Sequence, residues 1–316
     1  MENKCLYCYE SIDSQSDLHE KCSMAFFGSR KAPRVPYTIS QMVELAKNVV
    51  ERSISVPGVQ AKLSMSLISY TLGETDKRLT VVGALGGYFT LKPPAESYPE
   101  MPQNEHLTMR LAESFGIRVV PSSLIRLESG ELSYITKRID RKGEAAKIHM
   151  IDMFQILEAT DKYRSSIEKI GKALTAYSAN PMLDKLFFLE LTLFNFLIGN
   201  SDMHLKNFSM LQEGFGWILS PAYDLLNTKI LLPEDLEEMA LTLEGKKSRF
   251  KKEHFERFGT TLGLTNRQID GVFKRFLEGK QQALEWIGKS LLSTEMKQQY
   301  ANLMQDRYKR IYDPVQ

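Results

Sequence analysis

At 316 residues the chain can form one large domain or two lobes, and it is long enough to bury a sizeable core. Its formal charge of +2 is too small to predict nucleic acid or an anionic membrane as a general partner. No segment approaches the roughly 20 consecutive apolar residues of a membrane span, so we expect no membrane contact. The three cysteines cannot all pair with one another, which favours a reducing cytoplasm.

The first 36 residues predict an N-terminal arm and linker. The arm carries the pattern Cys5-x2-Cys8-x10-His19-x2-Cys22. Four such side chains could hold a structural Zn²⁺, because tetrahedral zinc sites often use paired spacings of this kind. The alternative is that the cysteines are buried apolar groups that pack the arm onto the main body. Residues 31–36 contain two prolines in four positions, which predicts a linker.

Residues 37–138 predict a small β-rich lobe. A helix is expected from Thr38 or Ser40 to about Arg52, and a second helix over 104–115. Short or alternating apolar runs bounded by turn residues predict strands at 62–68, 79–85, 88–92, 123–127 and 132–138.

Residues 139–316 predict a larger lobe. From about residue 150 onward the pattern is mostly helical, and residues 200–224 are the exception. Strands first and helices after are typical of an α+β protein, here with two unequal lobes.

The most informative motif follows a buried helix. Residues 186–198 form an apolar run too long for a strand, and Gly199 is expected to end the resulting helix. Asp202 and Asn207 then lie five positions apart, and Asp224 comes seventeen residues later. Phosphoryl transfer from ATP needs such a set. One carboxylate accepts the proton of the attacking hydroxyl, while an amide oxygen and a second carboxylate hold Mg²⁺.

The motif matches the protein-kinase pattern only in part. Protein kinases carry H-R-D-x-x-x-x-N and then D-F-G. Here the spacing from Asp to Asn is the same, but His204 comes two positions after the aspartate, and Tyr223-Asp224 stands in place of Asp-Phe-Gly. The alternative is a solvated loop, because Asn, Ser, Asp and Lys are ordinary turn residues.

Other segments could also serve an ATP site, and each has a structural alternative. The loop 53–62 contains Gly58, which lets the backbone approach an anion, but it could equally be a helix-to-strand turn. Lys92 ends an apolar strand and could hold phosphates, or it could be an edge-strand lysine that deters aggregation. Glu105 could pair with Lys92, or it could be a first-turn acid favoured by the helix dipole. Residues 135–141 could form a hinge beside adenine, or a charged strand end.

Taken together and in this order, these segments resemble the HipA family of bacterial serine/threonine kinase toxins. The resemblance covers roughly residues 50 to 230. The matching stretches are residues 55–63, 88–94, 104–112, 136–141, 199–209 and 220–227. The resemblance implies a bilobal protein-kinase-like fold with a small β-rich N-lobe and a larger, mostly helical C-lobe.

The resemblance also implies roles for individual residues. Asp202 would be the catalytic base, Asn207 and Asp224 would bind Mg²⁺, and Ser53 and Ser55 would be autophosphorylated. Ser53 and Ser55 form a Ser-Ile-Ser pair like that of the short HipT-type members. The residues that the resemblance places around ATP are Pro57, Gly58, Val59, Gln60, Ala61, Lys62, Lys92, Lys137, Arg138, Ile139, His204, Lys206, Asn207, Tyr223 and Asp224.

The implied function is that of a toxin in a bacterial toxin–antitoxin system. The family phosphorylates a serine of an aminoacyl-tRNA synthetase, glutamyl- or tryptophanyl-, and thereby inhibits translation and growth. Only about 50 residues precede the phosphate-binding loop, so the N-terminal subdomain of full-length HipA is expected to be missing. A HipS-like small protein would then supply it, and a HipB-like helix-turn-helix antitoxin would bind the complex. DNA would be reached only through that antitoxin.

Two other functions use the same residues. A kinase of related fold could phosphorylate a small molecule, since its ATP machinery would be the same. A catalytically silent regulatory module could instead recruit an antitoxin through the arm and a degenerate pocket. The joint presence of Lys92, Asp202, Asn207 and Asp224 argues against the silent module.

Overall fold

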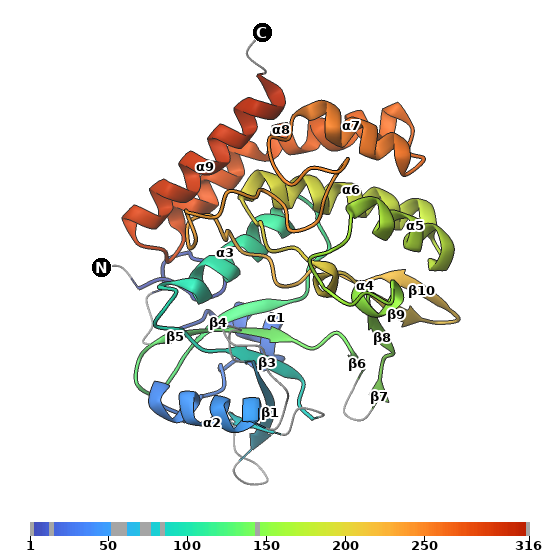
Figure 1. Cartoon of the computed structure of the whole chain (residues 1–316). Coiled ribbons are helices and arrows are strands. Elements are labelled where there is room, and N and C mark those ends of the chain that lie inside the picture. The colour runs from blue at the N-terminus through green and yellow to red at the C-terminus, as the bar shows by residue number, and fades with distance from the viewer. Residues whose placement is uncertain are drawn as a thin grey trace. The chain divides into compact units, whose positions relative to one another are not determined.

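The computed structural model describes residues 3–12, 16–51, 62–69, 77–82, 86–142 and 146–313 of the chain (Figure 1). The chain divides into two compact units. Unit 1 consists of Met1–His106, Val120–Ile139 and Lys289–Leu292. Unit 2 consists of Leu107–Val119, Asp140–Gly288 and Ser293–Gln316. Among the residues described, no helix is both long enough and apolar enough to cross a bilayer.

Unit 1 is built on a five-stranded antiparallel sheet. Its strands follow the order β2-β1-β3-β5-β4. Their bounds are β1 Leu63–Ser69, β2 Lys77–Val81, β3 Phe89–Lys92, β4 Ser122–Arg126 and β5 Leu132–Lys137. These strands confirm the β-rich pattern expected from the sequence, although residues 83–85 of one expected strand lie outside the described part.

The register of this sheet shows which side chains lie on each of its two faces. Leu91 of β3 is paired with Leu63 and with Ile135, and all three side chains are buried. Lys92 pairs with Tyr134, and because successive side chains alternate between faces, these two lie on the opposite side. Lys92 thus ends the central strand of the sheet, with Tyr134 of β5 as its neighbour.

Two helices and the expected linker complete this part of unit 1. Helix α1 spans Glu20–Phe27 and helix α2 spans Ile39–Glu51, the latter close to its expected bounds. Between them, Arg34 forms a bridge with Arg78 on the edge strand β2, and Val35 forms one with Leu127 at the end of the other edge strand, β4. The proline-containing segment therefore joins both edges of a curled sheet, and it adds backbone hydrogen bonds that a free linker would lack.

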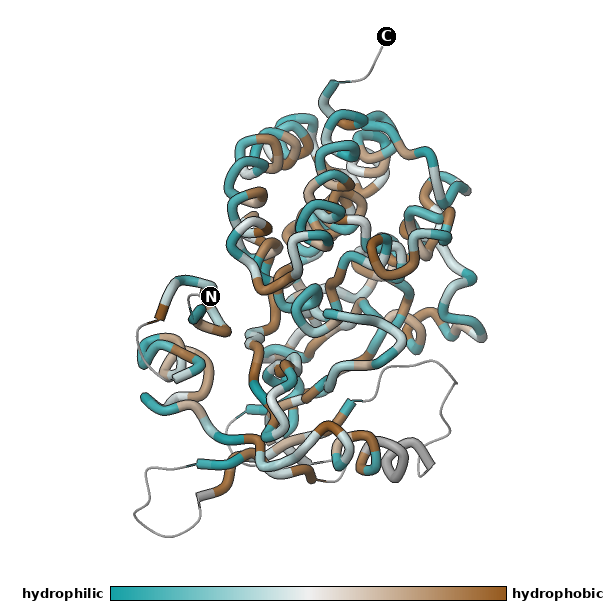
Figure 2. Tube along the Cα trace, turned by 90° about the vertical axis from the view of Figure 1, so that its left-hand side faces the viewer, coloured by the Kyte–Doolittle hydropathy of each residue, from teal (hydrophilic) through white to brown (hydrophobic). Residues whose placement is uncertain are grey.

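Helix α3, Met101–Ser114, contributes its first residues to unit 1 and its remainder to unit 2. The other helices of unit 2 are α4 Met153–Ile156, α5 Ile167–Tyr177, α6 Pro181–Ile198, α7 Lys252–Thr261, α8 Asn266–Lys289 and α9 Thr294–Tyr312, of which α8 ends on a residue of unit 1. Figure 2 shows hydrophobic and hydrophilic positions on the same turns of several of these helices, which is the pattern of amphipathic helices.

Helix α6 is the exception, because it is apolar nearly all round. Every residue from 187 to 198 is buried, which confirms the predicted buried helix. Gly199 ends the helix with a φ of 77°, a left-handed conformation that glycine adopts without steric cost.

Unit 2 also contains strands that the sequence analysis did not predict. A three-stranded antiparallel sheet has the order β10-β9-β8, with β8 at Met150–Asp152, β9 at Ser209–Glu213 and β10 at Gly216–Leu219. A short pair, β6 Arg141–Lys142 and β7 Ala146–Lys147, precedes it. Strands β9 and β10 form a hairpin within residues 200–224, the stretch that the sequence analysis set apart from the helical pattern without assigning strands to it.

Candidate active site

The segment between α6 and β9 is a loop fixed by hydrogen bonds at its start. The amide of Asn200 donates to Oδ1 of Asn195 on α6, at 2.8 Å. The backbone N–H of Ser201 donates to Oγ1 of Thr228 at 2.8 Å, and the Ser201 hydroxyl donates to Asp235 at 2.7 Å. Both residues are buried. Their polar groups therefore anchor the loop to unit 2 directly before Asp202.

Asp202 is exposed, and its carboxylate accepts a hydrogen bond from the Tyr163 hydroxyl at 2.9 Å. The ring of Tyr163 in turn lies edge-on to the buried ring of His204, with centroids 5.2 Å apart. Partial burial raises the pKa of Tyr163, and the negative charge of Asp202 raises it further. Tyr163 therefore keeps its proton at neutral pH and can orient the carboxylate.

Asn207 and Asp224 are in direct contact. Asn207 ends the 3-10 turn Leu205–Asn207, and its amide nitrogen donates to Oδ2 of Asp224 at 2.9 Å. Within the described residues, the buried amide oxygen of Asn207 has no hydrogen-bond partner. An unpaired amide oxygen beside a carboxylate fits Mg²⁺, which is a hard cation that binds oxygen ligands. The residues present therefore suit the magnesium ion that the motif implies.

The backbone of Asp224 is unusual. Its φ of 61° lies in the left-handed region, which few residues other than glycine adopt without cost. The contact with Asn207 holds the side chain of this residue, which follows β10 and lies close to the end of the hairpin.

Two other predicted residues, Tyr223 and Lys206, make contacts within unit 2. The hydroxyl of Tyr223 lies 2.5 Å from Oγ of Ser209 and donates to the backbone oxygen of Lys206 at 3.0 Å. Burial raises the pKa of Tyr223. The ammonium of Lys206 lies over the ring of Phe154, 4.7 Å from its centroid. Tyr223 thus links the backbone of Lys206 to Ser209, the first residue of β9.

In unit 1, Lys92 forms an ion pair with Glu105 of α3. The distance from Nζ to Oε1 is 2.5 Å, and both residues are buried, with 4% and 1% exposure. The Lys92 ammonium also lies over the ring of Tyr134, 5.4 Å from its centroid. Lys92 lies on a central strand and is buried, so the edge-strand interpretation was wrong. Glu105 is the fifth residue of α3, so it is not a first-turn acid.

The segment expected to lie beside adenine ends strand β5. The ammonium of Lys137 lies over the ring of Phe26 at 5.5 Å, and burial lowers its pKa. Arg138 donates to the backbone oxygen of Gly86 at 2.9 Å, and Ile139 is half-buried. These contacts tie the end of β5 to the turn before β3.

Of the predicted phosphate-binding loop, residues 53–62, the structure describes only the last residue. Lys62 is exposed and immediately precedes β1. The remaining predicted residues of the loop lie outside the described residues; they are Ser53, Ser55, Pro57, Gly58, Val59, Gln60 and Ala61.

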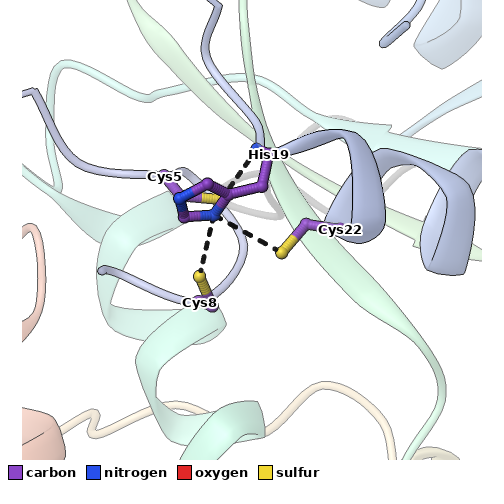
Figure 3. A group of neighbouring side chains, drawn as sticks. All are labelled: Cys5, Cys8, His19 and Cys22. Carbon is purple, nitrogen blue, oxygen red and sulfur yellow. Dashed lines mark hydrogen bonds between the residues drawn. The ribbon is translucent and has the colours of Figure 1, made fainter. Parts of the chain in front are cut away.

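The four Cys and His side chains of the arm also come together (Figure 3). One ligand atom from each of Cys5, Cys8, His19 and Cys22 lies within 4.8 Å of the others. Nδ1 of His19 is 3.4 Å from the sulfur of Cys8 and 3.8 Å from that of Cys22. The spacing of these residues in the sequence predicted one cluster, and the structure brings their ligand atoms together.

Unit 2 also has a surface hollow away from these groups. Its lining includes Arg118, Asp184 and Phe187, and none of the predicted site residues. Asp184 accepts hydrogen bonds from the Ser178 hydroxyl at 2.6 Å and from the backbone of Leu219 at 2.7 Å. Its carboxylate is thus bound within the fold, which is a structural role.

Among solved structures, the HipA, HipB and operator DNA complex from Shewanella oneidensis MR-1 contains a chain similar in fold to this one. The TM-score is 0.70 at 21% sequence identity, and the match covers 88% of this chain and 72% of that chain. This likeness, together with the strands and helices above, confirms the expected α+β fold of the HipA-like kinase class.

Sequence comparison gives the family. The family described as HipA-like C-terminal domain matches residues 54–284, which is most of the chain, and the chain belongs to this family. "Putative kinase Y4mE" of Sinorhizobium fredii is 31% identical over 249 residues, covering 73% of this chain and 57% of that protein. "Serine/threonine-protein kinase toxin HipA" of Shewanella oneidensis is 28% identical over 206 residues, covering 58% of this chain and 45% of that protein. The chain thus spans about half the length of these two relatives.

Proposed function

We propose that this chain is an ATP-dependent serine/threonine-protein kinase. The observation that carries the proposal is the contact between Asn207 and Asp224, which leaves a buried amide oxygen unpaired beside a carboxylate. Purely structural polar groups at such depth are normally satisfied by the fold itself. Asp202, five positions before Asn207, provides the carboxylate that a protein kinase uses to accept the proton of its substrate.

The proposed roles follow from these positions. The hydroxyl oxygen of a substrate serine attacks the γ-phosphorus of ATP, the bond to the ADP oxygen breaks, and the serine proton passes to Asp202. Asn207 and Asp224 would hold Mg²⁺, which neutralises phosphate charge when it is bound. Lys92 would contact the phosphates, and its pairing with Glu105 keeps the ammonium in one position. Tyr163 would orient Asp202.

We further propose that the kinase acts as a toxin. A relative bears the name of a kinase toxin, and a protein of similar fold is seen with HipB and operator DNA. By analogy, a HipB-like antitoxin would neutralise this chain, and a HipS-like small protein would be a second partner. The substrate would be a serine of an aminoacyl-tRNA synthetase. Phosphate on Ser53 or Ser55 would repel ATP and switch the enzyme off.

The decisive experiment is intact-mass spectrometry after phosphatase treatment and incubation with Mg·ATP. We expect wild-type protein to gain one or two phosphates and Asp202→Asn protein to gain none. Asp270→Asn is the matched control, because Asp270 is an exposed aspartate on α8, and it should behave like wild type. Equal phosphorylation of the Asp202→Asn protein would contradict the role of Asp202. An unchanged wild-type mass would contradict autophosphorylation.

Labelled ATP then tests the substrate class. Purified glutamyl- and tryptophanyl-tRNA synthetases are incubated with the wild-type and Asp202→Asn proteins, beside an extract of small metabolites. Label on a synthetase, absent with the variant, supports the toxin proposal. Label on metabolites alone would favour a small-molecule kinase. No label on any acceptor, together with an unchanged wild-type mass, would contradict kinase activity.

A further inference from the structure

The geometry of the arm points to a second site, and we propose that Cys5, Cys8, His19 and Cys22 bind one structural Zn²⁺. We also propose that this ion holds α1 and the preceding turn against β3 and α3, the two elements that carry Lys92 and Glu105. The metal site itself is independent of the kinase proposal. Only the consequence for ATP binding rests on it.

The first two ligands lie in one tight turn. The backbone N–H of Cys5 donates to the oxygen of Glu10 at 2.9 Å, and that of Tyr9 donates back to the oxygen of Cys5 at 2.9 Å. Tyr9 has a φ of 63°, so the chain reverses directly after Cys8. Such a turn brings two cysteines, three positions apart, to the same side, as zinc-binding turns require.

The second two ligands lie at the start of a helix. His19 is the N-cap residue of α1, and Cys22 lies in its first turn. Positions three apart in a helix share one face, so both side chains point toward the cysteine turn. Figure 3 shows a ring nitrogen of His19 facing the sulfur atoms of Cys8 and Cys22, with Cys5 behind the ring.

The histidine is held in the form that a metal ligand needs. Its Nε2 lies 3.0 Å from the backbone oxygen of Ser11, and a carbonyl can only accept a hydrogen bond, so the proton resides on Nε2. Nδ1 then carries the lone pair, and this is the atom that lies among the sulfur atoms. A hydrogen bond from the second ring nitrogen to a carbonyl is the usual support of zinc-bound histidine.

The alternative, that the cysteines are apolar packing groups, explains fewer of these observations than a zinc site does. Cys5 and Cys22 are buried, at 0% and 5% exposure, but Cys8 is only half-buried. Packing alone gives no reason for three sulfur atoms to converge on one imidazole nitrogen. A single disulfide would leave one cysteine and the histidine unused, whereas a tetrahedral metal uses all four groups.

The arm packs onto the elements of the Lys92–Glu105 pair. The rings of Phe26 and Phe27 on α1 lie 5.8 and 5.9 Å from that of Phe89, the first residue of β3. In the cysteine turn, the Tyr9 hydroxyl lies 2.6 Å from Nδ1 of His106, the residue after Glu105. Both sides of the ion pair therefore touch segments that the metal would fix.

Metal content tests the site directly. The full chain, purified under reducing conditions without chelator, is expected to hold one zinc per molecule by elemental analysis and native mass spectrometry. Co²⁺ in its place should show the visible absorption of a tetrahedral thiolate site. His19→Asn should lose zinc affinity by more than the roughly 10- to 100-fold that loss of an outer-shell partner costs.

Two further variants sharpen the result. His19→Cys supplies a fourth thiolate and should keep the zinc, whereas a purely structural histidine would give no such rescue. His149→Asn alters an exposed histidine elsewhere and should keep it too. Wild-type protein that takes up no zinc when reduced, or His19→Asn protein that binds it as tightly as wild type, would overturn the site. So would a native disulfide within the cluster.

The proposed effect of the metal on the Lys92–Glu105 pair is tested by a separate measurement. Removing zinc from the wild-type protein should lower its Tm and weaken ATP binding, measured by calorimetry without turnover. Chelator should have no such effect on His19→Asn protein. Bound zinc whose removal leaves ATP affinity unchanged would refute the link and leave the site intact. Protein that binds zinc but never binds ATP would contradict the kinase proposal instead.

Discussion

Tyr163 was not predicted as a site residue, and the structure adds it to the proposed active site. Its hydroxyl donates to Asp202, and its pKa is raised, so it remains a donor at neutral pH. A hydrogen bond to a charged group contributes about 1.5–3 kcal/mol, and about 1.4 kcal/mol corresponds to a tenfold change in rate. Tyr163→Phe should therefore lower kcat by about tenfold or more and leave KM for ATP unchanged, as steady-state kinetics can show.

The control for that prediction is Tyr177→Phe, because Tyr177 is an exposed tyrosine on α5. It should leave both constants unchanged. A Tyr163→Phe enzyme that changes KM for ATP but not kcat would show that the tyrosine positions nucleotide and not the base.

Single residues also show what a sequence can reveal. Asp202, Asn207 and Asp224 could be grouped because the chemistry of phosphoryl transfer fixes their order and residue types. Tyr163 could not be found, since it lies 39 positions before its partner in a stretch without a periodic pattern. The pairing of Lys92 with Glu105 remained one of two interpretations until the burial of both was known.

At the scale of elements, the junction between α6 and the loop that carries Asp202 depends on Gly199. Its φ is 77°, and an added Cβ would overlap Cδ2 of Leu303 and lie 3.0 Å from Oδ1 of Asn227. A left-handed conformation costs other residues about 1–2 kcal/mol, before any movement of Leu303. Gly199→Ala should therefore lower the unfolding free energy by about 2 kcal/mol or more, measured by urea denaturation, and reduce kinase activity.

Gly271→Ala is the comparison for this change. Gly271 lies within α8, and an added Cβ there would have no atom within 4 Å. Alanine in a helix is favoured over glycine by about 0.5–1 kcal/mol, so this variant should be at least as stable as wild type. If both variants lost stability equally, the destabilisation would reflect glycine replacement in general and not the geometry at Gly199.

Elements were predictable where one pattern ran long enough. The apolar run of α6 and the turn-bounded strands β1, β3 and β5 are determined by local sequence. Strands β8 to β10 were missed because β8 has only three residues and pairs with β9 across a distance of about 60 positions. The hairpin of β9 and β10 did leave a signal, because Gly214 separates two short runs that contain apolar residues.

For the whole molecule, tyrosines whose pKa is raised by full or partial burial predict sensitivity to alkali. Burial is the first cause of a raised pKa in Tyr134, Tyr163, Tyr223, Tyr300, Tyr308 and Tyr312. Above pH 10, their ordinary pKa, these groups release protons in the unfolded chain and retain them in the folded one. The unfolding free energy should therefore fall as pH rises through this range.

The basic group in the same part of the molecule does not reverse this trend. Burial lowers the pKa of Arg307, but its guanidinium is ion-paired with Glu238 at 2.8 Å and keeps its proton across this range. Thermal unfolding followed across this pH range should show a falling Tm, with a step in tyrosinate absorbance at each transition. Unfolding without such a step would contradict the prediction.

Unit 1 is assembled from segments that are far apart in the chain. Its arm is held by Lys289, whose backbone oxygen accepts from the ammonium of Lys4 at 2.8 Å and whose own ammonium pairs with Glu10 at 2.7 Å. Domains usually fold in turn as they leave the ribosome, the N-terminal one first. This unit cannot follow that order, because Lys289–Leu292 emerge only after most of unit 2. We therefore expect unit 1 to remain incomplete during synthesis until residue 289 has emerged, although most of its residues are made first.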